Sequence, residues 1–283
     1  MSTRVQITVT GDLLRALAEH RILLRYNQTV PVGDRYGWLD AGKVIALDRG
    51  LQIEENSGFY GGSYVGMKGS RRWAGLWSMG AFSYSYSPLP EPCIVGRYCS
   101  ISDGVRVLDS QHPTTSLTSS ALLVNRDNLL FDRARTEAVS NFSRRFRQNG
   151  GKAFPVIEHD VWIGAGAMLA MGITVGTGAV IASNAVVTRD VPAYSIVAGN
   201  PARVKKYRFE EPVRERLLES RWWEFEPREV FASGIDDPIK WLDRFEAESA
   251  TWSTYTPRFL DFARFADALR ESPIAEVADP SNG

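Results

Sequence analysis

The chain has 283 residues, and its formal net charge is zero because 33 lysines and arginines balance 33 aspartates and glutamates. Hydrophobic residues make up 44% of it, which argues against a disordered chain and against a strongly basic nucleic-acid-binding surface. A chain of this length forms one large domain or two small ones and buries a core without disulfides. The two cysteines, Cys93 and Cys99, form no CxxC motif and are typical of a reducing compartment.

The first 78 residues are expected to form an N-terminal extension with a short helix and irregular β segments. Residues 4–8 alternate weakly, as a strand does, and Asp12 is a candidate cap for a helix over residues 13–24. Charged residues interrupt this segment, so it lacks the apolar core of a secretory signal, and no run approaches the length of a membrane span. We therefore expect a soluble, cytoplasmic protein without a membrane span. Residues 44–87 are interpreted as irregular early coils.

A six-residue repeat organises the middle of the chain, from Ile157 to Pro192. Self-similarity at a short fixed period indicates a solenoid, and a period of six fits neither the helical period of 3.6 nor simple strand alternation. A triangular coil fits, with one short strand and one corner per unit and three units per turn. The same phase runs through residues 95–108 and then breaks until 156. The first position of each unit, which should fill the bore, is a bulky aliphatic residue: Ile157, Ile163, Leu169, Val175, Ile181 and Val187.

This stretch, with its ending VTRDVPAYSIVAGNPARV at 187–204, resembles the hexapeptide-repeat acyltransferases, whose fold is a left-handed parallel β-helix. The run YCSISDGV at 98–105, followed by a His-Pro pair and a serine and threonine cluster at 112–120, is similar to the branch that contains the xenobiotic (chloramphenicol and streptogramin) acetyltransferases. The segment RLLESRWWEFEPREV at 216–230 resembles that branch's short C-terminal helix. The resemblance covers roughly residues 79–230. It implies a left-handed β-helix domain at 79–204, although parallel crossovers are normally right-handed.

Two regions are expected to depart from the coil. The first is an extruded loop at about 109–155, which in the family reaches toward a neighbouring subunit, and a loop of this length is usually functional or disordered. The second is a helical C-terminal region at 205–283 that ends in a disordered tail. Helical spacing of apolar residues predicts its helices at 212–219, 238–248 and 257–270.

The chain has three histidines, His20, His112 and His159, and His112 is the candidate base of an acyl transfer. Transfer from a thioester to a hydroxyl needs one base with a pKa near neutrality and donors that hold the oxyanion. The resemblance implies that His112 is the base, because the loop histidine has that role in the xenobiotic branch. From the residues alone, the alternative that His112 is an exposed surface histidine without a catalytic role stays open. His159 is expected at a solvated corner, and His20 is given no role.

The resemblance also implies contacts with acetyl-CoA after the WIG motif, at the IAS and VTRD turns, and after GNPA. Coenzyme A needs a groove lined by small residues and cations near its phosphates. The alternatives stay open, since the corners of a coil need small residues for steric reasons and a basic cluster is often simply solvated. The candidate donor-binding residues are Trp162, Gly164, Ala182, Thr188, Arg189, Arg203, Lys205 and Lys206.

The implied function is an acetyl-CoA-dependent acetyltransferase that acts on a hydroxyl or amino group of a saccharide-like or small-molecule acceptor, by direct attack. The long additions at both ends favour an acceptor larger than an antibiotic. The resemblance implies a homotrimer, with His112 of one subunit facing the wall from Trp162 to Arg189 of another. A zinc lyase of the same fold needs three histidines on neighbouring coils, and this coil has two, so we expect no metal. A non-catalytic saccharide-binding or scaffold coil is the alternative.

Overall fold

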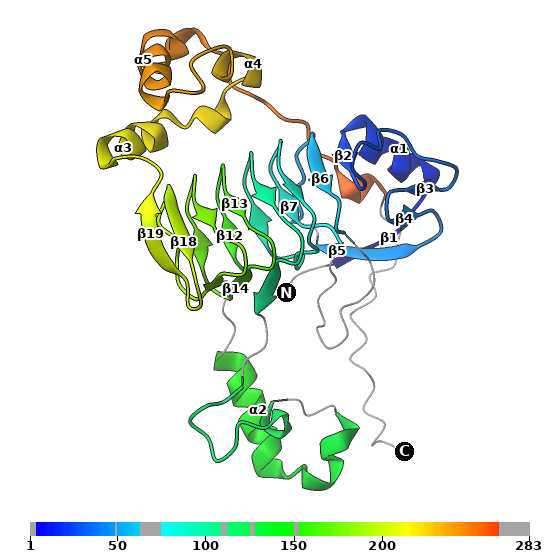
Figure 1. Ribbon diagram of the computed structural model, residues 1–283. Coiled ribbons are helices and arrows are strands. Elements are labelled where there is room, and N and C mark those ends of the chain that lie inside the picture. The colour runs from blue at the N-terminus through cyan, green and yellow to red at the C-terminus, as the bar shows by residue number, and fades with distance from the viewer. Residues whose placement is uncertain are drawn as a thin grey trace.

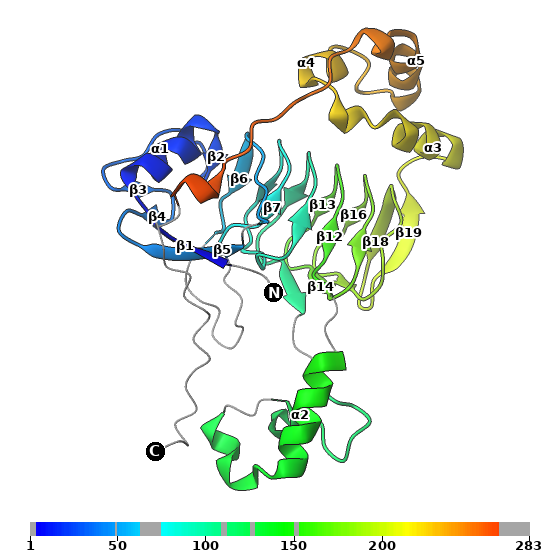
Figure 2. The ribbon, with the colours of Figure 1, turned by 180° about the vertical axis from the view of Figure 1, so that it is seen from behind.

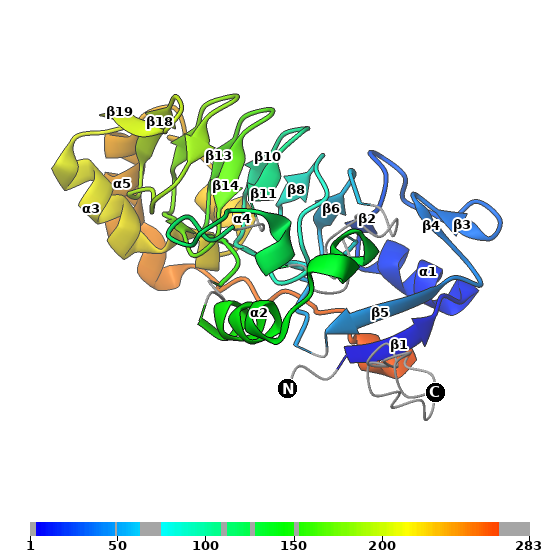
Figure 3. The ribbon, with the colours of Figure 1, turned by 90° about the horizontal axis from the view of Figure 1, so that it is seen from below.

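In the computed structural model, the six-residue period produces a coil of three parallel sheets, with further structural units attached to it (Figure 1). The structure describes residues 4–48, 50–62, 75–108, 112–124, 128–149 and 153–265. Viewed from below, the coil runs from β19 to β2, and the N-terminal unit lies at the β2 end (Figure 3).

Three successive turns of the coil, β9–β11, β12–β14 and β15–β17, each contribute one short strand to each sheet. The long sheet has eight strands in the order β19-β18-β16-β13-β10-β8-β6-β2, the second sheet has the order β15-β12-β9-β7, and the third has β11-β14-β17. The long sheet comprises β2 (Ile22–Leu23), β6 (Ser57–Phe59), β8 (Tyr84–Ser85), β10 (Ser100–Ile101), β13 (Trp162–Ile163), β16 (Val180–Ile181), β18 (Ser195–Ala198) and β19 (Arg203–Tyr207). The four-stranded sheet comprises β7 (Ser78–Met79), β9 (Ile94–Val95), β12 (Val156–Ile157) and β15 (Thr174–Val175). The three-stranded sheet comprises β11 (Arg106–Leu108), β14 (Met168–Ala170) and β17 (Val186–Val187).

The bore of the coil is filled by the aliphatic residues that open each repeat unit. Equivalent residues stack in register, as Ile163 does on Ile181 and Leu169 on Val187. Burying one such side chain contributes about 1.5–3 kcal/mol, so the repeated stacking is a large part of the stability of the fold. The parallel coil expected from the period is confirmed. All six opening residues are at most 2% exposed: Ile157, Ile163, Leu169, Val175, Ile181 and Val187.

The N-terminal unit joins the coil earlier than its irregular sequence suggests. The helix α1 (Gly11–Glu19) is capped by the side chain of Thr10, not by Asp12, and it ends before the position predicted. The next residues form β2, which pairs in parallel with β6. The parallel ladder of the long sheet therefore begins well before residue 79. Beside it lie the antiparallel pairs of β1 (Arg4–Thr8) with β5 (Val44–Asp48) and of β3 (Arg35–Tyr36) with β4 (Leu39–Asp40).

Between β11 and β12 the chain leaves the coil at the corner that joins the three-stranded sheet to the four-stranded sheet. The segment contains α2 (Glu137–Asn149) and two 3-10 turns, η1 (Ala121–Leu123) and η2 (Leu129–Ala134). It projects away from the coil, on the opposite side from α3 and α5 (Figures 1 and 2). The ladder continues across the excursion, because β11 pairs directly with β14.

After β19 the chain forms a helical unit with its own small core. It comprises α3 (Glu211–Ser220), η3 (Trp222–Glu224), α4 (Pro227–Val230), α5 (Pro238–Glu248) and η4 (Ser249–Thr251). The predicted helices at 212–219 and 238–248 are confirmed by α3 and α5. The core of the unit contains Leu217, Val230, Trp241 and Leu242, and Tyr194 of the coil packs with them.

From η4 the chain returns along the coil to the N-terminal unit (Figure 2). The helix predicted at 257–270 is wrong for its described part, because Phe259 bridges to Glu54 and only residues 262–265 form a 3-10 turn, η5 (Phe262–Phe265). Leu260 and Phe262 are buried whereas Phe259 is 50% exposed. Burial therefore alternates with a period of two, as in an extended segment that covers the N-terminal core. The tail at 272–283 lies outside the described residues. In the part of the chain that is described, no helix combines the length and the apolar character that a membrane span requires.

Candidate active site

His112 lies at the start of the excursion, a few residues after β11, and its side chain is exposed. Its Nδ1 lies 2.7 Å from the backbone oxygen of Ser119. A carbonyl oxygen only accepts hydrogen bonds, so the Nδ1 of His112 carries the proton and donates it. In the neutral ring, Nε2 then has the free lone pair. This is the arrangement in which an imidazole can accept a proton from a substrate.

The serine and threonine cluster after His112 holds the carbonyl to which the ring is bonded. The Oγ1 of Thr118 accepts the backbone N–H of Ser120 at 3.1 Å, and the Oγ of Ser120 accepts that of Leu122 at 3.2 Å as the cap of η1. These bonds fix the backbone on both sides of Ser119. The cluster therefore orients the imidazole, a role that the sequence pattern did not indicate.

The predicted donor-binding residues of the long sheet lie on its outward face and at its edge. Trp162 is 55% exposed, on β13. Gly164 and Ala182 stack at the corner that leads to the three-stranded sheet, and a Cβ at Gly164 would lie 2.6 Å from the backbone nitrogen of Ser183. Close packing between neighbouring turns of the coil therefore explains this glycine without a ligand. The edge strand β19 carries three predicted cations in exposed positions: Arg203, Lys205 and Lys206.

Thr188 and Arg189 lie elsewhere, in the exposed turn after β17. That turn leads from the three-stranded sheet to the four-stranded sheet, which is the same corner from which the excursion with His112 departs. The three-stranded sheet separates this corner from Gly164 and Ala182. Within one chain, the predicted residues thus form two groups rather than one cleft. None of the ion pairs recorded among the described residues uses Arg189 or the three cations of β19.

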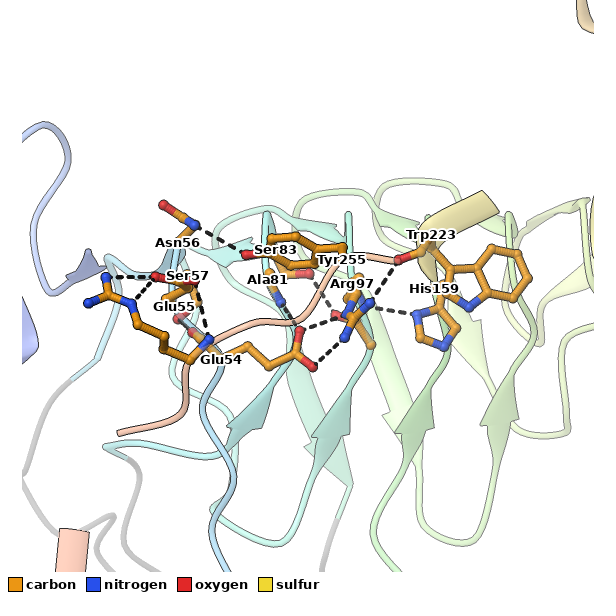
Figure 4. A network of polar contacts seen from close by, with 12 residues as sticks. Glu54, Glu55, Asn56, Ser57, Ala81, Ser83, Arg97, His159, Trp223 and Tyr255 are labelled. Atoms are coloured by element: carbon orange, nitrogen blue, oxygen red, sulfur yellow. Dashed lines mark hydrogen bonds and ion pairs between the residues drawn. The ribbon is translucent and has the colours of Figure 1, made fainter. Parts of the chain in front are cut away.

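Sequence reasoning missed a polar network on the coil surface, centred on Arg97 (Figure 4). The guanidinium of Arg97 donates to both carboxylate oxygens of Glu54, at 2.7 and 2.9 Å, and to the backbone oxygen of Trp223 at 2.9 Å. The side chains of the pair are only 14% and 13% exposed. The ring of Tyr255 packs over the guanidinium, with 5.3 Å from Cζ to the ring centroid. The network joins the coil to the helical unit and to the returning chain.

His159 belongs to this network, although its position in the repeat predicted a solvated corner. Its ring stacks on Trp223 with 4.8 Å between centroids, and its Nδ1 accepts the backbone N–H of Arg97 at 3.1 Å. Burial, followed by the charge of Arg97, lowers the pKa of His159. The residues of the network line a groove with a volume of about 480 Å³. All the polar groups named here are paired with one another, which indicates a structural clamp. No sequence signal links His159 to Trp223, because only the fold brings them together.

Metal chemistry has no obvious site in the part of the chain that the structure describes. There, no three His, Cys, Asp or Glu side chains lie close enough together to hold a metal ion.

Comparisons with known proteins agree with the repeat. Residues 154–189 match the family described as bacterial transferase hexapeptide (six repeats). A chloramphenicol acetyltransferase of Agrobacterium fabrum is 53% identical over 68 residues, which are 24% of this chain and 32% of that protein. A probable macrolide acetyltransferase of Lysinibacillus sphaericus is 30% identical over 155 residues, which are 52% of this chain and 78% of that protein. Among solved structures, the serine acetyltransferase of Brucella abortus is 24% identical, with a TM-score of 0.29 over 46% of this chain and 39% of that one.

The length matched differs between these relatives. The chain spans about a third of the chloramphenicol acetyltransferase and more than three quarters of the macrolide acetyltransferase. About half of the present chain, by contrast, lies outside the longer of the two alignments.

Proposed function

The chain belongs to the hexapeptide-repeat acetyltransferases, in the branch that includes chloramphenicol and macrolide acetyltransferases, and from this membership we propose that it moves an acetyl group from acetyl-CoA to a hydroxyl or amino group of a saccharide-like or small-molecule acceptor. The family implies a left-handed winding of the coil. The observation that carries the proposal is the state of His112, whose Nδ1 is held by Ser119 while Nε2 is left free in an exposed position.

The chain's own contribution to the chemistry is a proton transfer. The Nε2 of His112 accepts the proton of the acceptor hydroxyl as the oxygen forms its bond to the acyl carbon, and the imidazolium later returns the proton to the leaving sulfur. The hydrogen bond that Nδ1 donates to the backbone oxygen of Ser119 keeps the ring oriented in both states. Acetyl-CoA supplies the acyl group already activated as a thioester.

The residues present fit the negatively charged donor. Arg203, Lys205 and Lys206 are exposed, and within the described ranges they form no recorded ion pair, so their charge is available to phosphate oxygens. Trp162 presents an exposed ring on the same sheet. Gly164 is a weaker candidate, since close packing already explains it.

The separation of the two groups of residues supports a site formed by two subunits. In one chain, the excursion that carries His112 leaves the coil at the corner between the three-stranded and four-stranded sheets. Gly164 and Ala182 stack at the corner between the long sheet and the three-stranded sheet. A second copy can supply the group that the first lacks. We therefore propose a homotrimer, as the family implies, in which the corner of one subunit that carries His112, Thr188 and Arg189 faces the Gly164 and Ala182 corner of the next.

The test measures donor binding and turnover separately. Acetyl-CoA is titrated by calorimetry into the wild type, His112→Ala and His20→Ala. His20 is the matched control, because its Nδ1 also lies near a backbone oxygen, that of Ala16 at 2.8 Å, but on α1. All three proteins should bind acetyl-CoA with similar affinity. Thiol release with hydroxyl and amino acceptors should fall at least about 100-fold in His112→Ala and stay unchanged in His20→Ala.

Each outcome decides one part of the proposal. Absence of acetyl-CoA binding in all three proteins would overturn the transferase and favour a non-catalytic saccharide-binding or scaffold coil. Wild-type turnover in His112→Ala, with donor binding intact, would remove His112 as the base.

A further inference from the structure

The N-terminal unit, which lies next to the β2 end of the long sheet (Figure 1), contains a second groove. It has a volume of about 870 Å³ and is formed by the residues after β2, the hairpin of β3 and β4, and the residues after β6. Its lining includes Arg25, Tyr26, Asn27, Trp38 and Tyr60. None of these belongs to the candidate active site described above.

Tyr26 and Tyr60 line the groove and belong to a cluster of four tyrosine rings. Tyr60 lies at the centre, with its centroid 5.7 Å from that of Tyr26, 5.9 Å from that of Tyr84 and 5.2 Å from that of Tyr86. Tyr26 is 62% exposed and Tyr86 is 42% exposed. Tyr26 is nevertheless held in an edge-to-face contact with Tyr60, at an interplanar angle of 81°. Such exposed rings in fixed positions combine a flat apolar face with a polar tip.

The walls of the groove are preformed by close packing. The Nε1 of Trp38 donates to the backbone oxygen of Phe59 at 2.7 Å. A Cβ at Gly62 would overlap the ring of Trp38, and a Cβ at Gly58 would lie 2.7 Å from the ring of Tyr60. The two glycines therefore let the chain approach both rings closely. A site that is built before its ligand arrives loses little entropy on binding.

The polar groups of the groove suit a ligand rich in hydroxyl groups. Burial, followed by the neighbouring Tyr86, Tyr26 and Tyr84, raises the pKa of Tyr60, so its phenol stays neutral and can both donate and accept hydrogen bonds. None of the described residues that line the groove is acidic, and Arg35 is paired with Asp40 at 3.0 Å. Arg25 is the one further cation among these described residues, and one arginine is too little positive charge to hold a nucleic acid.

We infer that this groove binds a pyranose oligosaccharide, whose C–H faces stack on Tyr26 and Tyr60 and whose hydroxyl groups bond to the surrounding phenol, amide and guanidinium groups. The inference names the acceptor class of the proposed transfer, and for that role it rests on the proposed function. Position supports the link, because Tyr84 is in register with Ser100 and Ser100 with Trp162 on the long sheet. Two strand spacings, about 10 Å, separate Tyr84 from Trp162 along the sheet. A chain held in the groove can thus extend toward the donor-binding face.

The test uses the full-length protein and saturation-transfer NMR with maltohexaose, cellohexaose and chitohexaose. The wild type should transfer saturation to the ring C–H protons of at least one hexasaccharide. Tyr26→Ala should weaken that binding at least about threefold, because an aromatic face is lost. Tyr26→Phe keeps the ring and should stay within about twofold of the wild type. The matched control is Phe259→Ala, which removes a ring that is 50% exposed outside this groove, and it should bind as the wild type does.

Because Tyr26 is exposed, we expect Tyr26→Ala to keep its fold, so weaker saccharide binding reports the loss of the ring. Acetyl-CoA titration of each variant checks directly that the fold is intact. The inference is overturned if none of the three hexasaccharides binds the wild type, or if Tyr26→Ala binds as well as the wild type. It is also overturned if Phe259→Ala loses binding to the same extent. Saccharide binding without any acetyl-CoA binding would keep the groove and reject the proposed transfer, so the two failures are distinguishable.

Discussion

Replacement of Arg97 by methionine should destabilise the protein through the carboxylate that it leaves behind. The change removes two hydrogen bonds to Glu54 and one to the backbone oxygen of Trp223. The carboxylate of Glu54, whose side chain is 13% exposed, then keeps one hydrogen-bond partner among the described residues, the backbone N–H of Ala81 at 2.8 Å. Breaking one side of a buried pair costs about 3–5 kcal/mol. We take the lower end, about 3 kcal/mol, because the groove admits some water to this pair.

Thermal unfolding followed by circular dichroism measures this cost. At about 2–4 °C per kcal/mol for a chain of this size, Arg97→Met should lower the melting temperature by roughly 6–12 °C. The double variant with Glu54→Gln removes the stranded charge and keeps an acceptor for Ala81, so it should regain about half of the loss. A decrease below about 2 °C in the single variant, or a double variant less stable than the single one, would refute the reasoning.

Three further predictions concern other parts of the molecule. Burial and Arg97 lower the pKa of His159 below its ordinary value of 6.5, so as the pH falls the unfolded chain binds a proton before the folded chain does, and stability drops. Between pH 7.5 and 5.5, the melting temperature of the wild type should therefore decrease more than that of His159→Gln. Equal decreases in the two proteins would contradict this. Lys206→Ala should weaken calorimetric binding of acetyl-CoA about fivefold but that of 3′-dephospho-acetyl-CoA less, whereas Lys240→Ala, at a 79% exposed side chain, should change neither. Gly62→Ala should cost about 1–3 kcal/mol in denaturant unfolding, because its methyl group overlaps Trp38; unchanged stability would show that the ring of Trp38 moves to make room for the methyl group.

The coil could be predicted from the sequence because its energetics are local and repeated. Every sixth residue must be a bulky aliphatic to fill the bore, and Ile163, Leu169 and Ile181 do so with at most 2% exposure. The break in phase after Leu108 likewise locates the excursion. The helices α3 and α5 could be predicted because each has one apolar face and a proline in its first turn.

Interactions between segments far apart in the chain could not be predicted in this way. The apolar residues of 257–270 have helical spacing in the sequence, but Leu260 and Phe262 pack on the N-terminal core instead, from an extended stretch that ends in the 3-10 turn η5. His159 occupies a corner position of the repeat. Only the packing of η3, which follows α3, places Trp223 on its ring. For the candidate base, the position of His112 follows from the motif, whereas its bond to the carbonyl of Ser119 follows from the turn geometry.

The last strand of the long sheet also affects how molecules meet in solution. A stack of parallel strands exposes unpaired N–H and C=O groups at its ends, and such an edge can template growth into fibres. At this end the chain reverses, and β19 pairs with β18 antiparallel and with a register shift between Ile196 and Val197. All five residues of β19 are exposed, and three of them are cationic. Like charges repel a second coil that approaches with its own β19, so this strand disfavours pairing of two such ends along the axis of the coil.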